Sequence, residues 1–154
     1  HSQTAKDLSM PAIHDVLQRY STLFETLSIQ TVEEDFLQVF SADVYFKDPF
    51  NAVRGLPHLQ HIFQQMFATL HEPQFHILDC AGHQQSGFLE WQLTFKLKPQ
   101  GDSHLIQGTS KILINEQGQV CSHIDYWDTG EYLYLKIPLL GRVIGMINKR
   151  LSTS

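Results

Sequence analysis

The nine residues Leu89-Glu-Trp-Gln-Leu-Thr-Phe-Lys-Leu97 alternate strictly between apolar and polar side chains. A period of two is the period of a β-strand, so the stretch predicts a strand over Phe88–Leu97 with one buried and one wetter face. Antiparallel sheets packed on one side contain strands of this kind. We therefore expect the neighbouring segments to continue an antiparallel sheet.

The segments on both sides of this strand also favour β-structure. They are rich in Val, Ile and aromatic residues, and Gly101–Asp102 and Asn115–Gly118 are typical turn sequences between them. The predicted strands are Ala42–Asp48, which Pro49 ends, and Phe75–Cys80, Leu105–Ile114 and Val120–Asp128. The last three and Phe88–Leu97 form one meander, whereas we interpret Asn51–Arg54 as a loop.

The chain before this meander has helical periodicity at three places. Apolar side chains recur from Ile13 to Leu27, and a shorter helix begins at Thr31, where Thr31 and Glu34 have the spacing of a capping box. A third helix begins at Gly55 and is apolar from Leu59 to Leu70. Three helices, one intervening strand and a meander indicate an α+β fold.

Length and composition are typical of one globular domain. The chain has 154 residues, 42% of them apolar and 18% charged, and 11 Lys and Arg against 16 Asp and Glu give a formal net charge of −5. We predict one domain over 1–131, with 132–154 as its C-terminal extension. The acidic balance argues against nucleic-acid binding, and no apolar run reaches the roughly 20 residues of a membrane span.

Cysteine and histidine usage has no metal-site signature. Cys80 and Cys121 lie far apart in predicted strands, and we interpret them as reduced, buried thiols, which fits a cytoplasmic protein. Of nine histidines, only His58 and His61 form a helical pair. Because a metal site needs three or four converging ligands, we expect neither a metal nor another cofactor.

The run Val44-Tyr-Phe-Lys-Asp-Pro-Phe50, followed by Gly55 and a helix, resembles the nuclear-transport-factor-2-like (NTF2-like) superfamily. Its members include ketosteroid isomerases, limonene epoxide hydrolases and SnoaL-like polyketide cyclases. The run Tyr132–Gly141 is similar to an uncharacterised bacterial branch. The resemblance implies a curved antiparallel sheet wrapped around three N-terminal helices, a cone with an internal cavity, and a homodimer formed through the outer face of the sheet.

The resemblance to ketosteroid isomerases implies three catalytic residues. Asp48 falls on their general base, and Arg19-Tyr20 reproduces the Arg-Tyr pair whose Tyr is an oxyanion donor. Their third residue, a protonated Asp that donates a hydrogen bond, falls on Ser110. A Ser hydroxyl also donates, but it is a weaker acid and has a shorter reach.

The last strand resembles a different enzyme. Ile124-Asp-Tyr-Trp-Asp128 is similar to the Arg-Asp-Tyr-Phe-Asp run of limonene epoxide hydrolases, whose catalytic Asp falls on Asp125. Those enzymes also need an Arg and a second Asp on an earlier strand, where this chain has Trp91-Gln-Leu93. The chain therefore carries half of each of two catalytic sets.

Strand alternation indicates which of these side chains share a face. It places His123, Asp125 and Trp127 together, and the resemblance points them into the cavity with Phe46 and Asp48. The candidate catalytic residues are Asp48, Asp125, Tyr20, His123 and Ser110, and the candidate ligand-binding residues are Phe46, Trp91, Leu93 and Trp127. If Asp48 and Asp125 share an apolar cavity, burial and repulsion raise the pKa of at least one of them.

Each candidate has a structural alternative. Asp48-Pro49 is also a common turn sequence, and Asp125 could instead form a buried ion pair with His123 or Arg19. Tyr20 is equally compatible with a helix face in the core, the tryptophans with cavity walls, and His123 with a structural histidine.

The sequence leaves two functions open. One is an enzyme that acts on a small apolar ligand by acid–base chemistry of the isomerase, cyclase, dehydratase or epoxide hydrolase type, with Tyr20, Ser110 or His123 polarising an oxygen. The other is a non-catalytic carrier of a lipid-like ligand, or a protein-interaction module, because one fold serves both.

Residues 139–151 predict a short amphipathic helix with a basic side. It is too short to cross a membrane. Two roles stay open for it: packing on its own domain or dimer partner, or peripheral contact with an anionic membrane.

Overall fold

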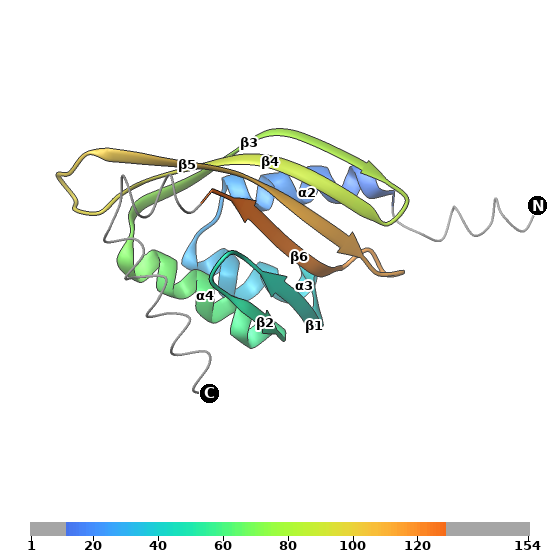
Figure 1. The fold of residues 1–154 in the computed structure, drawn as a ribbon. Helices are drawn as coiled ribbons and strands as arrows, with labels where there is room; N and C mark the ends of the chain where they lie inside the picture. Colours follow the sequence, from blue (N-terminus) through green and yellow to red (C-terminus); the bar gives the residue numbers. More distant parts are fainter. Residues whose placement is uncertain (1–11, 129–154) are drawn as a thin grey trace, which may run out of the picture.

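The computed structural model describes residues 12–128 (Figure 1). Its elements in chain order are α2 (Ile13–Glu25), the π-helical turn η1 (Thr31–Asp35), α3 (Phe36–Val39), β1 (Phe40–Lys47), β2 (Ala52–Arg54), α4 (Leu56–Thr69), β3 (His71–His83), β4 (Ser86–Lys96), β5 (Ser103–Ile114) and β6 (Val120–Trp127). The predicted α+β fold is confirmed in these residues.

The six strands form one sheet in the order β2-β1-β6-β5-β4-β3. All neighbours are antiparallel except β1 and β6, which pair in parallel with Phe46 beside His123. The expected curved antiparallel sheet is confirmed for the other four strand pairs. Strands β1 and β6 can pair in parallel because α4 and the β3–β5 meander form a long connection between them. The predicted loop at Asn51–Arg54 contains strand β2, which pairs with β1 at its end.

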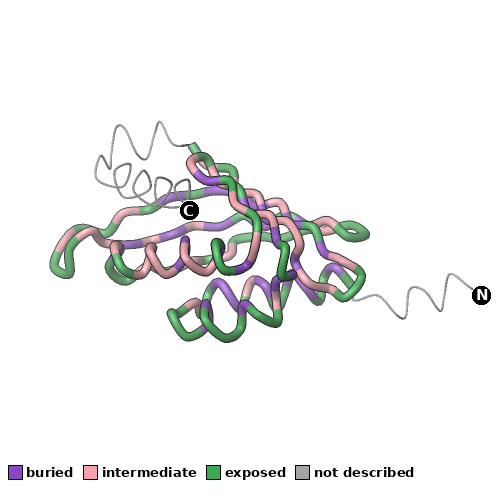
Figure 2. Tube along the Cα trace, turned by 90° about the horizontal axis from the view of Figure 1, so that it is seen from below, coloured by how far each residue is buried: buried purple, intermediate pink, exposed green. Residues whose placement is uncertain are grey.

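The sheet curves around the helices, so that β1 and β2 lie below the long strands β3, β4 and β5 (Figure 1). Helix α2 packs under β3 and β4, whereas α4 packs against β1 and β2. Buried residues lie along both the helices and the strands (Figure 2), and most of the buried apolar side chains form one core cluster between the helices and the sheet. Phe36, Leu17 and Ile112, which are fully buried, come from three different elements of this core.

The buried face of α2 follows from the spacing of apolar residues in its sequence. Its six buried side chains recur at three- and four-residue spacing along one face: Ile13, Val16, Leu17, Tyr20, Leu23 and Phe24. Burying this face against the sheet stabilises the helix more than its intrinsic propensity does. The same spacing fixes Tyr20 on the inner face of the helix.

The expectation of buried cysteines was wrong. Cys80 is exposed and Cys121 is half-buried, and both are free. Cys80 is exposed because β3 is an edge strand with a wetter outer face.

The extension 132–154, with the amphipathic helix expected at 139–151, lies outside the described residues. Within residues 12–128, no helix has the length and apolarity needed to cross a membrane.

Candidate functional site

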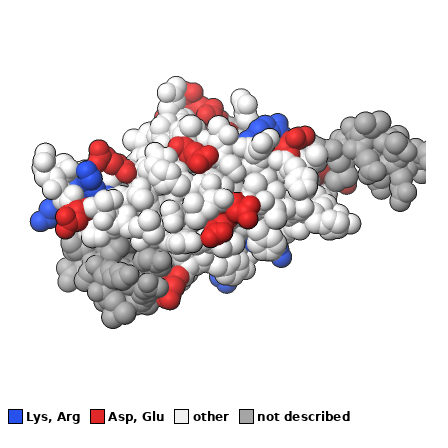
Figure 3. Space-filling view, turned by 90° about the horizontal axis from the view of Figure 1, so that it is seen from above, with Lys and Arg blue, Asp and Glu red and all other residues white. Residues whose placement is uncertain are grey.

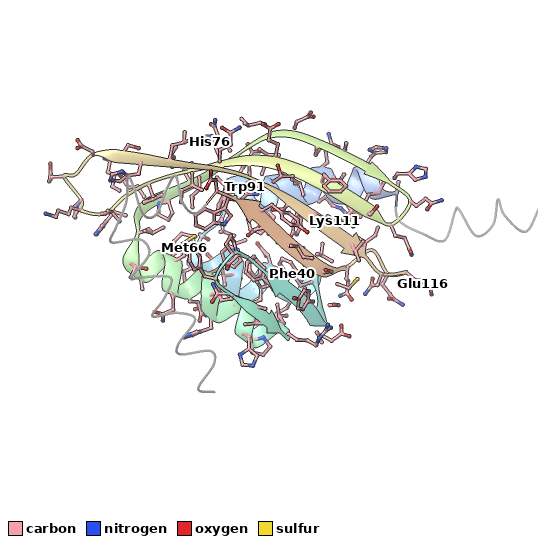
Figure 4. The ribbon with its side chains drawn as sticks, in the orientation of Figure 1. Phe40, Met66, His76, Trp91, Lys111 and Glu116 are labelled. Atoms are coloured by element: carbon pink, nitrogen blue, oxygen red, sulfur yellow. The ribbon has the colours of Figure 1, made fainter. Side chains whose placement is uncertain are left out.

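A cavity of about 130 Å³ lies between the concave face of the sheet and the helices. All nine side chains predicted from the sequence line it: Tyr20, Phe46, Asp48, Trp91, Leu93, Ser110, His123, Asp125 and Trp127. Trp91 on β4 and Met66 on α4 point toward each other across this space, whereas His76 points to the outer side of the sheet (Figure 4). These residues therefore surround one cavity, and their catalytic or ligand-binding roles stay predictions.

Strand alternation brings the polar residues together. His123, Asp125 and Trp127 line the cavity from alternate positions of β6, and Ser110 lies opposite Asp125 on β5. On the neighbouring pair of strands, β4 and β5, Trp91 lies opposite Gly108. A Cβ atom at Gly108 would lie 2.6 Å from the Trp91 ring, so only glycine leaves room for the indole at this position.

A continuous chain of hydrogen bonds joins five of these residues. The indole N–H of Trp91 donates to Ser110 Oγ at 2.8 Å, and the Ser110 hydroxyl donates to Asp125 Oδ1. Asp125 Oδ1 also lies 2.6 Å from His123 Nε2, and His123 Nδ1 lies 2.5 Å from Tyr20 Oη. The chain starts on β4, crosses β5 and β6, and ends on α2.

The positions of the protons in this chain follow from counting donors. Burial, followed by the negative charge of Asp125, raises the pKa of Tyr20 well above its ordinary value, so its hydroxyl stays neutral. The Tyr20 hydroxyl has no other acceptor among the described residues, so we assign it as the donor to His123 Nδ1, which places a proton of His123 on Nε2. The Nε2–H group of His123 then donates to Asp125 Oδ1. Every donor in the chain has an acceptor in this arrangement.

Asp125 is the charged acceptor in the middle of this hydrogen-bond chain. Oδ1 accepts hydrogen bonds from Ser110 and His123, whereas Oδ2 accepts none from the described residues. The side chain is 16% exposed and lines the cavity, so Oδ2 is available to a bound molecule. Of the two partners that the sequence left open for Asp125, His123 forms the pair and Arg19 is exposed on α2.

Asp48 has a different environment. Its Oδ1 accepts from the backbone N–H groups of Phe50 at 2.8 Å and Asn51 at 2.6 Å, and the Asn51 side-chain amide lies 3.1 Å from both carboxylate oxygens. Burial raises the pKa of Asp48; the hydrogen bond from Asn51 opposes this shift, and repulsion from Asp125 adds to it. The carboxylate therefore closes the turn after β1, as the structural alternative for Asp48-Pro49 expected.

Tyr20, Ser110 and His123 were predicted to donate a hydrogen bond to an oxygen of the ligand, and all three are already hydrogen-bonded within the protein. The Tyr20 hydroxyl is bonded to His123, and the Ser110 hydroxyl and the Nε2 proton of His123 are both bonded to Asp125. Each of the three would have to leave its partner to polarise a ligand oxygen. In this conformation Ser110 and His123 hold Asp125, and Tyr20 holds His123.

Sequence reasoning missed several walls of the cavity. Phe24 on α2, Phe63 on α4 and Phe75 on β3 close it from three directions, with Phe24 and Phe75 in edge-to-face contact at 5.6 Å. Asn51 also lines it and is 5% exposed, and its side-chain carbonyl oxygen has no donor among the described residues. Its place three residues after Asp48 was the one available signal, since Asx turns often use such spacing.

No three His, Cys, Asp or Glu side chains between residues 12 and 128 are arranged to bind a metal ion. The polar groups of the cavity are carboxylates, one imidazole, hydroxyls, an amide and indoles.

Several solved structures share this fold. An NTF2-like protein of unknown function from Burkholderia pseudomallei K96243 is 12% identical and matches with a TM-score of 0.65 over 79% of this chain and 95% of its own. A hypothetical protein with a ketosteroid isomerase-like fold from Catenulispora acidiphila DSM 44928, in complex with trimethylamine, is 11% identical, with a TM-score of 0.64 over 77% of this chain and 89% of its own.

An M. tuberculosis protein described as a limonene epoxide hydrolase-like epoxide hydrolase is 11% identical and has a TM-score of 0.63 over 84% of this chain and 92% of its own. At these identities the likeness concerns the fold alone. No curated protein shows a significant sequence match to this chain. The model of the SnoaL-like domain matches residues 17–123. This range includes seven of the nine predicted site residues and ends before Asp125 and Trp127. The chain therefore belongs to the SnoaL-like domain family and has the NTF2-like fold.

Proposed function

We propose that this protein binds a small, mainly apolar molecule in the cavity and that Asp125 acts on it as a general base. The observation that carries the proposal is the unequal use of the two carboxylate oxygens. Ser110 and His123 hold Oδ1, which fixes the orientation of the side chain, while Oδ2 stays available to the ligand. A fixed carboxylate in a largely apolar cavity is a typical arrangement for proton abstraction or water activation.

The other titratable groups of the cavity support this assignment. Loop amides already surround the carboxylate of Asp48, and both ring nitrogens of His123 are hydrogen-bonded within the chain. His123 is also 5% exposed and stacks on Phe46, with ring centroids 5.3 Å apart. We therefore infer that His123, Ser110 and Tyr20 position Asp125.

The reaction class follows from what the cavity contains. Isomerisation, cyclisation, dehydration and epoxide opening all use a base of this kind, and the members of this fold include cyclases, isomerases and epoxide hydrolases. A second candidate, a non-catalytic carrier of an apolar ligand, is supported by the bonded state of Tyr20, Ser110 and His123. A carrier needs the cavity but no free oxyanion donor.

Nitrobenzisoxazole tests the base directly. A base removes the ring C–H proton, the N–O bond breaks, and the cyanonitrophenolate product absorbs visible light. We expect the full chain to accelerate this ring opening, and Asp125→Asn to lose about 10²-fold or more of the rate, the usual contribution of a general base. Asp48→Asn is the matched control, because it changes the other carboxylate of the same cavity, and it should keep most of the rate.

The outcomes separate the two candidates. An Asp125→Asn protein that keeps the wild-type rate would show that Asp125 is not the base. A wild-type protein that binds the probe but reacts no faster than free acetate would favour the carrier.

We also propose that the protein forms a homodimer through the outer face of the sheet. Phe88 on β4, Leu113 on β5 and Tyr126 on β6 point outward and are 46%, 39% and 57% exposed. Seen from above, this face carries only scattered charged side chains (Figure 3). Exposed apolar side chains on neighbouring strands are typical of protein interfaces.

A further inference from the structure

The polar atoms of the cavity mostly bond to one another. Tyr20 and Ser110 donate within the hydrogen-bond chain, and the side-chain amide of Asn51 donates to Asp48. The Thr69 hydroxyl donates to the Gln65 carbonyl, one helical turn earlier. These donors are therefore not free for a ligand in this conformation.

The atoms that remain are mainly acceptors. Asp125 Oδ2 and the side-chain carbonyl of Asn51 have no donor among the described residues. The indole N–H of Trp127 is a remaining donor, since it makes no hydrogen bond within residues 12–128. The Trp127 N–H is a neutral donor. A hydrogen bond from a ligand to the charged acceptor Asp125 is about twice as strong as a bond between neutral groups, so Asp125 is the stronger binding group.

The charge of the cavity has one sign. Among the described residues that line it there are two Asp and no Lys or Arg. The negative charge of Asp125 raises the pKa of Tyr20 and of Asp48, although burial is the larger cause for both. Aromatic rings such as those of Phe75, Trp91 and Trp127 also present electron-rich faces that attract positive charge.

We infer that the ligand of this cavity carries a hydrogen-bond-donating head group, a hydroxyl or a protonated amine, on a small apolar body, and that this group binds Asp125 Oδ2. The inference rests on the proposed function, because it names the class of ligand for the same site. A ketone leaves Asp125 Oδ2 without a donor in the occupied cavity, which is unfavourable, and an anion is repelled by the carboxylate.

Four cyclohexane derivatives with the same ring test this inference: cyclohexanol, cyclohexylammonium, cyclohexanone and cyclohexanecarboxylate. The chain has two tryptophans, Trp91 and Trp127, and both line the cavity, so their indole N–H signals in NMR spectra report its occupancy. We expect the alcohol and the ammonium ion to bind to the full chain with at least tenfold lower Kd than the ketone. The carboxylate should bind more weakly still.

The comparison of the two donors identifies the head group. Tighter binding of cyclohexylammonium indicates an amine ligand, and tighter binding of cyclohexanol indicates a hydroxyl ligand. In Asp125→Asn, the ammonium ion should lose at least tenfold in affinity while the affinity of the ketone stays the same. Asp79→Asn is the matched control, because Asp79 is an exposed carboxylate on β3 that does not line the cavity, and it should keep the wild-type order of the four compounds.

Two results would overturn the inference. The first is a ketone or carboxylate that binds the wild-type protein as tightly as both donors. The second is an ammonium ion whose affinity does not change in Asp125→Asn. Either result leaves ligand binding by the cavity intact, whereas failure of all four compounds to bind would contradict the proposed function as well.

Discussion

Tyr20 Oη and His123 Nδ1 lie 2.5 Å apart, although 103 positions separate the two residues in the chain. The contact joins helix α2 to strand β6 inside the core, where Tyr20 is 2% exposed. With Tyr20 as the donor, the His123 proton lies on Nε2, the nitrogen that is 2.6 Å from Asp125 Oδ1. An apparently structural tyrosine thus reaches the charged group of the cavity through one histidine.

Tyr20→Phe tests this relationship. The ring can keep its edge-to-face contacts with Phe24 and Phe40, but His123 Nδ1 loses its donor. We expect the free energy of unfolding to fall by about 1–3 kcal/mol, the usual effect of leaving one buried partner unsatisfied. Nitrogen-15 chemical shifts of His123 should change from one neutral tautomer to a mixture of two. An unchanged tautomer would show that Tyr20 does not determine it.

Gly108→Ala tests the packing of Trp91. The new Cβ atom would lie 2.6 Å from the indole ring, so the ring must move and its hydrogen bond to Ser110 should weaken. We expect a shift of the Trp91 indole N–H signal and a loss of about 1–3 kcal/mol in the free energy of unfolding, as for other overpacked cores. Gly101→Ala is a control, since this position is in the turn between β4 and β5. A Trp91 signal unchanged by Gly108→Ala would contradict the predicted displacement.

The raised pKa of Asp48 predicts a pH dependence of stability. The raised pKa means that the Asp48 carboxyl binds its proton more tightly in the folded chain than in the unfolded chain. The contribution of Asp48 to the free energy of unfolding therefore falls as pH rises from 3.8, the ordinary pKa of Asp, through the raised pKa of the folded state. Asp48→Asn cannot titrate at this position. We therefore expect the stability of wild type relative to Asp48→Asn to fall over this window and to level off above it.

Urea unfolding of both proteins at a series of pH values measures this difference. A difference that rises with pH would mean that the hydrogen bonds from Phe50 and Asn51 outweigh burial, and that the pKa of Asp48 is lowered.

The proposed dimer can be tested at the outer face of the sheet. Phe88→Glu places a charge among exposed apolar side chains and should convert a dimer of 17.7 kDa chains into monomers, as measured by sedimentation equilibrium. Ile29→Glu is the matched control, because Ile29 is 52% exposed but lies just before η1. A wild-type protein that sediments as a monomer at high micromolar concentration would contradict the proposal.

The alternation of side chains in β6 and β4 was sufficient to predict which residues share the cavity. A period of two is a local property of the backbone, so His123, Asp125 and Trp127 had to face one side, as had Trp91 and Leu93. The inner face of α2 was predictable for the same reason. The NTF2-like fold itself was recognised from the run Val44–Phe50 and the elements that follow it.

Only the tertiary structure decided what these residues do to one another. Nothing local to Tyr20 points to His123, and nothing in Asp48-Pro49 distinguishes a free base from a carboxylate that Asn51 surrounds. The parallel pairing of β1 with β6 likewise depends on how the sheet closes around the helices. Periodicity specifies the face on which a side chain lies. A hydrogen bond also needs a donor and an acceptor about 3 Å apart, and here these atoms come from segments far apart in the chain. Those distances are set by packing of the whole core.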